Sequence, residues 1–494
     1  MSNNLARRSI ASVGWNAGAS VITITVLFVR SVLLARLLPV DVFGVYAGVG
    51  ALIALTVVLP NFGMGAAFLH RAPETEDEER AAAVHFTLKL IFTLLWAAAM
   101  IAWGLIFTQG QTRTTLIVVT IATAGIQLAQ TPDLILTRRV VHRRLALLQS
   151  ATAISTTLVA VFLAWRGVTL WALLATDIVT LVVTLVMLYV WRPVWRPRLA
   201  WVPDVVRYYL RFGSKVVTSV GLLQALNNVD DLWTRYYLGT TAMGYYSRAY
   251  TFATYPRRVL AGPVNDVAGG TYAELKRDRR RLSQAFFRSN ALLVRTGFFM
   301  GGVLALIAPE LVMILLGEKW LPMLQAFRLM LVFTLLDPIK LTVGNLFVAV
   351  GQPELLIRTR LVQLAVLVIG LYTLGFRLGI TGVALVVDVM LIVGMVVLFH
   401  QARVHVDYSL RQLFAVPTLA LILGLAAGAG AMLLAGNQAT ANLLMAVLKG
   451  GAFSVVFVAV LWIFEHRQLT SMAIQIGIRL PWLSLGRSRP DDAE

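Results

Sequence analysis

The 494-residue sequence contains no cysteine, which excludes disulfide bonds and thiolate metal sites. Acidic residues are also scarce, since 24 aspartates and glutamates accompany 43 lysines and arginines. The six histidines lack the spacing of metal ligands and no Walker A motif is present, so we expect no metal, no cofactor and no ATP-driven pump. The longest polar link between apolar stretches runs only from Trp191 to Phe212, which leaves no room for a soluble catalytic domain.

Apolar residues dominate what is there. Hydrophobic residues make up 58% of the chain and charged residues 14%, and the mean hydropathy is +0.77. Apolar windows of roughly 20 residues recur from Val13 to Phe464 between short polar links, as in proteins with membrane-spanning helices. We therefore predict an all-α polytopic membrane protein with about 14 transmembrane helices. The predicted spans are residues 13–35, 44–68, 83–107, 115–136, 146–165, 168–191, 213–234, 241–269, 284–308, 323–349, 356–376, 380–400, 413–435 and 442–464.

The basic residues are distributed unequally among the links. If the N-terminus is cytoplasmic, the cytoplasmic links contain 28 lysines and arginines and the external links contain 6. The positive-inside rule therefore places both termini in the cytoplasm and supports an even number of spans. The net charge of +19 follows from this topology and from contact with anionic lipid, so it does not indicate nucleic-acid binding. The first span is too long for a signal peptide, and we expect the chain to retain it.

Two sequence patterns occur twice. The pattern L-[PG]-x4-G-x-Y is found at Leu38–Tyr46 and, 200 residues later, at Leu238–Tyr246. A second match relates residues 167–173 to residues 379–385, and an aspartate follows each copy. Together the matches align the first six spans with the next six, which predicts two parallel-repeat six-helix lobes around a central cavity.

This repeat defines the expected domains. We assign an N-terminal lobe to residues 1–212 and a C-terminal lobe to residues 213–411. Residues 412–494 then contribute two further spans and an amphipathic cytoplasmic tail.

Several predicted spans contain charged residues that a bilayer rejects. An ionised side chain at mid-bilayer costs about 3 kcal/mol, so such residues normally face a water-filled cavity or a partner. The acidic candidates, for ion coupling or gating, are Asp177, Asp230, Asp231, Asp266 and Asp388. The basic and aromatic candidates, for a binding cavity, are Arg30, Lys89, Arg248, Tyr255, Arg257, Arg258 and Arg295.

These candidates also have structural interpretations. Lys89 and Arg295 lie near enough to span ends for their side chains to reach the headgroup layer. Arg257 and its neighbour Arg258 can pair with an aspartate of the same hairpin, and Asp230 and Asp231 can close a salt bridge between lobes. Asp177 and Asp388 occupy matching repeat positions, which favours a shared structural role. Three other basic residues are assigned to span ends or headgroup contacts: Arg328, Lys340 and Lys449.

Three stretches carry a family resemblance. They are LLARLLPVDVFGVYAG near the first turn, LTRRVVHRRLAL after the fourth span, and NNVDDLWTRYYLGTTAMGYYSRAYTFATYP in the second repeat. The sequence resembles the polysaccharide-transporter (Wzx-type) branch of the multidrug/oligosaccharidyl-lipid/polysaccharide (MOP) exporter superfamily over residues 10–400. The resemblance implies two six-helix lobes in a V. It also implies a flippase that moves undecaprenyl-pyrophosphate-linked oligosaccharides to the outer leaflet of the bacterial inner membrane.

The resemblance gives the charged candidates a role. A lipid-linked sugar has an anionic pyrophosphate, a polar glycan and a polyprenyl tail, so its carrier needs buried cations and a hydrated cavity open to lipid. Arginine suits bidentate phosphate contact, and lysine supplies a point charge. The implied partners are the polyprenyl-pyrophosphate-linked oligosaccharide, membrane lipid, and a polysaccharide polymerase with its export machinery.

Other functions remain as alternatives. Fourteen-span relatives include lipid II flippases of peptidoglycan synthesis, and a cation-coupled multidrug exporter shares the same plan. Organic cations favour acidic cavity residues, however, and the predicted spans contain more basic than acidic side chains. A membrane glycosyltransferase or polymerase needs a sizeable external loop, which the short external links do not supply, so we expect a transporter and not an enzyme.

Overall fold

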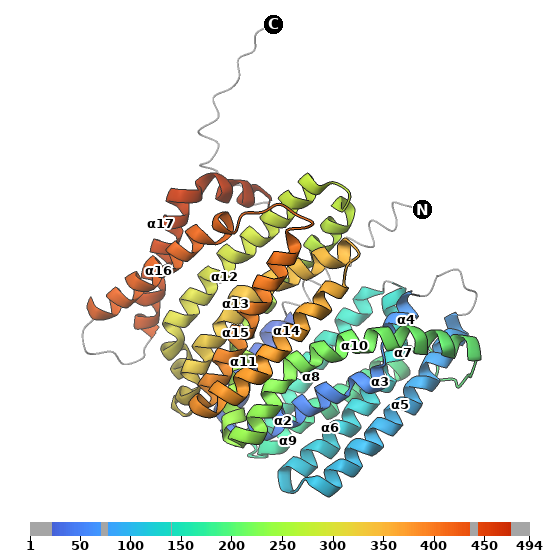
Figure 1. The fold of residues 1–494 in the computed structure, drawn as a ribbon. Helices are drawn as coiled ribbons and strands as arrows, with labels where there is room; N and C mark the ends of the chain where they lie inside the picture. Colours follow the sequence, from blue (N-terminus) through green and yellow to red (C-terminus); the bar gives the residue numbers. More distant parts are fainter. Residues whose placement is uncertain (1–21, 71–77, 140, 435–442, 476–494) are drawn as a thin grey trace. The chain divides into compact units, whose positions relative to one another are not determined.

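The computed structural model describes residues 22–70, 78–139, 141–434 and 443–475 (Figure 1). The described chain is helical throughout and has no strand in these ranges. Ten of the described helical stretches are long and apolar enough to cross a membrane. The predicted all-α polytopic membrane fold is therefore confirmed.

Residues 22–37 form the first helical segment and the remaining elements follow in chain order. In the first half these are α2 (Val40–Thr56), α3 (Val58–Asn61), α4 (Met64–His70), α5 (Glu78–Phe107), α6 (Gly110–Leu128), α7 (Gln130–Arg138), α8 (His142–Trp165), α9 (Thr169–Leu185), η1 (Val186–Val190) and α10 (Pro203–Trp233). In the second half they are η2 (Thr234–Leu238), α11 (Thr240–Leu275), α12 (Arg279–Leu315), η3 (Glu318–Met323), α13 (Leu324–Ala349), α14 (Glu354–Gly370), η4 (Leu371–Gly375), α15 (Phe376–Ala402), α16 (Leu410–Leu434) and α17 (Leu443–Gln475).

The predicted spans are largely helical over their described residues, although the span 44–68 is divided among α2, α3 and α4 and the span 115–136 between α6 and α7. Two predicted spans share the continuous stretch Glu354–Ala402, where Gly379 departs from helical geometry with a φ of 58°. The helices α10 and α11 fall outside the ten apolar stretches because polar and charged residues interrupt them. These are the helices whose charges led us to expect a functional site.

The chain forms two compact units. Unit 1 comprises Met1–Val259, Val312–Met330 and Glu354–Val396, and unit 2 comprises Leu260–Leu311, Leu331–Pro353 and Val397–Glu494. We describe each unit by itself. The lobe boundaries expected at residues 212 and 411 remain a prediction.

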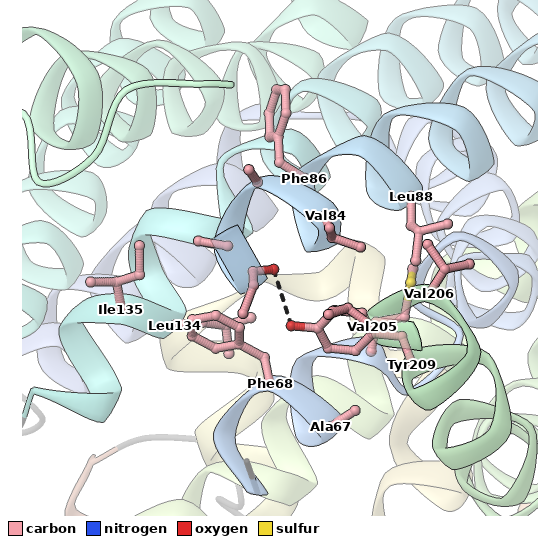
Figure 2. Close-up of a cluster of buried hydrophobic side chains, with 14 of the residues drawn as sticks. Ala67, Phe68, Val84, Phe86, Leu88, Leu134, Ile135, Val205, Val206 and Tyr209 are labelled. Carbon is pink, nitrogen blue, oxygen red and sulfur yellow. Dashed lines mark hydrogen bonds between the residues drawn. The ribbon is translucent and has the colours of Figure 1, made fainter. Parts of the chain in front are cut away.

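Aromatic and aliphatic side chains form a buried cluster in unit 1 (Figure 2). Phe68 of α4, Val84 of α5 and Leu134 of α7 pack there with Tyr209 of α10. The Tyr209 hydroxyl donates a hydrogen bond to the Ala81 carbonyl at 3.1 Å, which satisfies its one polar atom inside the core. This cluster fixes the first turns of α5 and α10, the two helices that carry Lys89 and Asp230.

The repeated L-[PG]-x4-G-x-Y pattern has a direct structural reason. A Cβ atom on Gly44 of α2 would lie 1.8 Å from the Thr240 carbonyl oxygen, and one on Gly244 of α11 would lie 2.2 Å from the Val40 carbonyl oxygen. The two repeat glycines therefore let the first turns of α2 and α11 touch backbone to backbone. Only glycine permits this approach.

In unit 2, α12 packs against α16 and α17 through aromatic rings and two ion pairs. The Phe453 ring of α17 fills the space beside Gly302 and Gly424, where any side chain would collide with it. Lys449 Nζ lies 2.6 Å from the Glu310 carboxylate, and the lysine is only 5% exposed. The lipid-headgroup contact expected for Lys449 was wrong, because the amine is buried against a carboxylate of α12.

Candidate cationic site

Two arginines of unit 1 lie near each other in the described structure. Arg30 lies in helix 22–37 and Arg248 lies in α11, and both side chains are half-buried. Arg30 Nη1 donates to the Thr156 hydroxyl of α8 at 3.0 Å, and Arg248 Nη1 contacts the Ser31 hydroxyl at 3.5 Å. The two guanidinium groups lie close enough to repel each other electrostatically. Neither forms an ion pair among the described residues.

Aromatic rings surround the two arginines. The Arg248 guanidinium carbon lies 4.6 Å from the centre of the Phe43 ring, a cation–π contact. Phe28 stands edge-on to Tyr255 with 5.0 Å between ring centres. Rings beside cations suit the stacking of sugar faces, and they exclude water from the charges.

The Tyr46 hydroxyl of α2 donates a hydrogen bond to Asp177 of α9 at 2.8 Å. Asp177 also interacts electrostatically with Arg30. We call Phe28, Arg30, Tyr46, Asp177, Arg248 and Tyr255 the Arg30–Arg248 cluster. It contains two cations and one carboxylate, so it has one positive charge more than it can neutralise.

The hydrogen bonding of Arg248 is incomplete. Its Nε atom is buried and has no hydrogen-bond partner among the described residues. A buried donor without a partner costs about 1 to 3 kcal/mol, and more when it is charged. An anion with several oxygens, such as a phosphate, would satisfy such guanidinium groups.

Lys89 lies in a different part of unit 1. Its amine donates to Asn61 at 2.5 Å, to Gln127 at 2.6 Å and to the Pro60 carbonyl at 3.3 Å. The lysine is fully buried in the described structure, with 0% exposure. Three neutral oxygens thus hold this cation, and it does not reach a span end.

The acidic candidates of the second repeat are arranged differently from Asp177. Tyr246, the repeat counterpart of Tyr46, donates to Asp230 at 2.5 Å. Asp388, which follows the second copy of the repeated segment as Asp177 follows the first, is buried, and its Oδ1 atom has no hydrogen-bond partner among the described residues. Asp231 is half-buried beside Asp230 on α10. The repeated tyrosine has therefore kept a carboxylate partner but changed which carboxylate it is.

The remaining candidates lie apart from the Arg30–Arg248 cluster or at its edge. Arg295 of unit 2 forms a bidentate ion pair with Glu465, with both N–O distances 2.8 Å. Arg258 is exposed, and its guanidinium lies 5.6 Å from the Tyr255 ring. Arg257 is half-buried on the same helix. The Asp266 side chain lies outside the described residues.

Sequence reasoning missed the neutral lining of the site. Phe28, Tyr46 and Thr156 complete the cluster, yet aromatic and hydroxyl residues are ordinary in membrane helices. Tyr46 alone had a usable signal, because it ends the repeated pattern. The other two come together only through the packing of helix 22–37 against α8 and α11.

Known proteins share both the sequence pattern and the fold. A family model described as "Polysaccharide biosynthesis protein" matches residues 33–325, more than half of the chain. The succinoglycan biosynthesis transport protein ExoT of Rhizobium meliloti (strain 1021) is 27% identical over 338 residues, which cover 63% of this chain and 63% of that protein. The match thus spans less than two thirds of the relative's length.

Two solved structures share the fold. The lipid II flippase MurJ, in an inward closed conformation, has a TM-score of 0.74 at 13% identity, covering 93% of this chain and 100% of that chain. An inward-facing multidrug resistance MATE family transporter of the MOP superfamily has a TM-score of 0.57 at 16% identity, covering 77% of this chain and 94% of that chain. The resemblance to the Wzx-type branch of this superfamily is confirmed, and the chain belongs to the polysaccharide biosynthesis protein family.

Proposed function

We propose that the chain is a flippase that moves undecaprenyl-pyrophosphate-linked oligosaccharide units from the inner to the outer leaflet of the bacterial inner membrane. The observation that carries this proposal is the Arg30–Arg248 cluster, whose two embedded arginines have no carboxylate partner of their own. A pyrophosphate supplies several acceptor oxygens in the geometry that guanidinium groups bind best. The protein performs no covalent chemistry in this proposal.

The rest of the cluster suits the rest of such a substrate. Tyr255 and Phe28 offer aromatic rings to the glycan, and the polyprenyl tail stays in the surrounding lipid. The similarity to a succinoglycan transport protein supports a polysaccharide unit as the cargo. The product would pass to a polymerase and to export machinery that build an exopolysaccharide, a capsule or an O-antigen.

We propose alternating access as the mechanism. Residues 1–212 and 213–411 would rock against each other, as the internal repeat suggests, with both termini in the cytoplasm. Asp230, Asp231 and Asp388 are the candidates for coupling this motion to protons or cations, and Asp177 gates the arginines through Tyr46. Asp266 remains a candidate from the sequence alone.

The same proposal assigns different roles to the remaining basic candidates. Arg257 and Arg258 follow Tyr255 along α11 and extend the positive charge from the cluster. Lys89 and Arg295 act as structural cations. Neutral oxygens already bind the Lys89 amine, and the Glu465 carboxylate already pairs with Arg295.

Substitution of the two arginines tests the proposal. Arg30→Ala and Arg248→Ala, at wild-type levels in the membrane, should each reduce surface glycan at least about tenfold, the effect of losing one charged hydrogen-bonding group. Arg248→Lys should restore only part of the output, since lysine cannot bind phosphate in a bidentate manner. Arg166→Ala is the matched control, because Arg166 is exposed at the end of α8 and lies outside the cluster. Normal glycan output from the Arg30→Ala/Arg248→Ala double variant would refute the proposal.

A lipid II flippase is the second candidate, favoured by the TM-score of 0.74 with MurJ over the whole of that chain. Lipid II also contains a polyprenyl pyrophosphate, so the arginine variants do not separate the two cargoes. Rescue of cells depleted of their lipid II flippase does. Growth with this chain would select lipid II, and failure to grow combined with normal polysaccharide export would exclude it.

A multidrug exporter is disfavoured by the same charges. An organic cation would meet two arginines in the cluster and one carboxylate that already accepts a hydrogen bond from Tyr46.

A further inference from the structure

Unit 2 has a cavity of about 610 Å³ at one end of its helices. The link between α11 and α12, the end of α13 and the segment after α15 line it. Its volume lies within the range of small-molecule sites, roughly 300 to 1,000 Å³. The basic residues around it belong to the group that the positive-inside rule assigns to the cytoplasm.

Two of the lining cations have no counterion. Lys276 and Arg277 are exposed in the α11–α12 link, and neither forms an ion pair among the described residues. Arg279 differs, because it binds both oxygens of Asp407, at 2.8 and 3.1 Å, and the carbonyls of Arg403 and Val404. Arg279 therefore holds the segment after α15 in place, while Lys276 and Arg277 supply positive charge that nothing else neutralises.

A cavity of unit 1 provides the contrast. It measures about 320 Å³ and is also lined by arginines. There Arg139 pairs with Glu78 at 3.1 Å and Arg198 pairs with Glu79 at 2.6 Å. Two of the three arginines that line that cavity therefore have a carboxylate partner, whereas in the unit 2 cavity only Arg279 has one among the described residues.

Apolar side chains form the remainder of the unit 2 cavity. Val348 is 60% exposed and Val404 is 69% exposed, and Leu282 lies behind them. Ala349 and Val350 also line the cavity, and the chain turns after them at Gly351, which has a φ of 78°. The cavity thus combines unpaired cations with an apolar wall.

We propose that this cavity binds the phosphate of a lipid headgroup from the inner leaflet, with Lys276 and Arg277 contacting the phosphate and Val348 and Val404 contacting the start of the lipid chains. An anionic phospholipid and a polyprenyl pyrophosphate share this chemistry. A free soluble anion uses only the cations and leaves the exposed valines uncovered. The site shares no residue with the Arg30–Arg248 cluster.

Native mass spectrometry of the purified full chain tests the site, with phosphatidylglycerol, phosphatidylcholine and undecaprenyl pyrophosphate as probes. Lys276→Ala/Arg277→Ala should weaken binding of phosphatidylglycerol about tenfold, as expected for two basic residues near a membrane surface. The matched control is Arg280→Ala/Arg281→Ala, which removes the same charge from the next turn but does not line the cavity. Arg281 pairs with Asp278 at 3.4 Å, so this control also frees a carboxylate. A general charge effect would therefore reduce binding at least as much in the control.

The outcomes separate the two lipids. Loss of phosphatidylglycerol alone in the Lys276/Arg277 variant assigns the site to phospholipid, and loss of undecaprenyl pyrophosphate alone assigns it to the carrier lipid. Loss of both supports a site for either phosphate. Equal losses in both double variants, or phosphatidylcholine binding as strong as phosphatidylglycerol binding, would overturn the proposal. Thermal unfolding of each variant checks that the fold is intact.

Discussion

The contact between Gly44 and Gly244 gives a quantitative prediction. Real Cβ atoms essentially never lie closer than 3.0 Å to another heavy atom, yet an alanine at position 44 would place its Cβ atom 1.8 Å from the Thr240 carbonyl oxygen. The obstacle is backbone, so no side-chain rotation relieves it. In Gly44→Ala, α2 and α11 must therefore separate by at least the difference between these two distances.

We expect this separation to cost about 1 to 3 kcal/mol of unfolding free energy, the usual range for overpacking. Gly50, two turns further along α2, is the matched control because a Cβ atom there would have nothing within 4 Å. Gly50→Ala gains helix propensity and should stabilise the protein by up to about 1 kcal/mol. The two substitutions should thus shift the melting temperature in opposite directions.

The assay is thermal unfolding of the purified chain in detergent, followed together with surface glycan output. Transport should fall further than stability in Gly44→Ala, because α2 carries Phe43 and Tyr46 whereas α11 carries Arg248. A shift of about an ångström at the helix contact misplaces these groups, which can cost on the order of 100-fold in a positioned site. Equal melting-temperature shifts for Gly44→Ala and Gly50→Ala would refute the close contact and the explanation of the repeated pattern.

Three further predictions concern charged groups elsewhere. Arg295→Met should destabilise unit 2 by about 3 to 5 kcal/mol because it leaves the buried Glu465 carboxylate without its ion-pair partner. Arg295→Met/Glu465→Met, which removes both charges, should be nearly neutral. A double variant as unstable as the single variant in thermal unfolding would contradict this prediction. Lys89→Met should lower the melting temperature by leaving two amide oxygens without their donor, and glycan export per folded molecule should not change; a selective loss of export would instead make Lys89 a transport residue. Partial burial and repulsion from Arg279 hold the pKa of His405 below its usual range, so its imidazole is neutral at pH 7. A bound phosphate favours the protonated form, so phosphatidylglycerol affinity should rise as pH falls from 7 to 5 in the wild type, and His405→Gln should abolish the rise.

The sign of the His405 prediction follows from the groups that face the imidazole. Burial and then repulsion from Arg279 lower the pKa of His405, and Asp407 is already bound to Arg279. The His405 Nε2 atom lies 3.1 Å from the Gln352 side-chain oxygen, a neutral partner. Protonation therefore lowers the stability of the free protein as pH falls through the ordinary pKa of histidine. An anionic headgroup reverses that balance locally.

The helices of this chain follow from its sequence because the bilayer imposes a simple length and composition rule. The exceptions, α10 and α11, were recognisable for the same reason, since their charges break the rule. The sequence also singled out Arg30 and Arg248 as candidates, because an embedded charge is costly and needs a partner or a ligand. What they contact was not, because packing alone brings Thr156 and Phe43 to them.

The partners of Arg295 and Lys449 were hidden by small errors in the span boundaries. Glu465 lies one residue beyond the predicted span 442–464, and Glu310 lies two residues beyond the predicted span 284–308. The helix Arg279–Leu315 continues past Glu310, whereas Glu465 lies at a kink in α17, with a φ of −136°. Helix ends are the least certain part of a sequence prediction. An acidic residue just past a span end should therefore be tested as the counterion of any embedded cation.

The embedded cations differ in whether a carboxylate partner pairs with them. Arg295 and Lys449 in unit 2 each meet a buried carboxylate, which leaves no charge for a ligand. The Lys89 amine donates to three neutral oxygens, which leaves it no donor for a ligand. Arg30 and Arg248 differ from these three cations: their contacts are with hydroxyl groups and an aromatic ring, and one buried donor of Arg248 has no partner among the described residues. A buried site with excess positive charge gains stability when an anion binds it. The excess of two arginines over one carboxylate is therefore the reason why we propose this cluster as the site for a phosphate-bearing substrate.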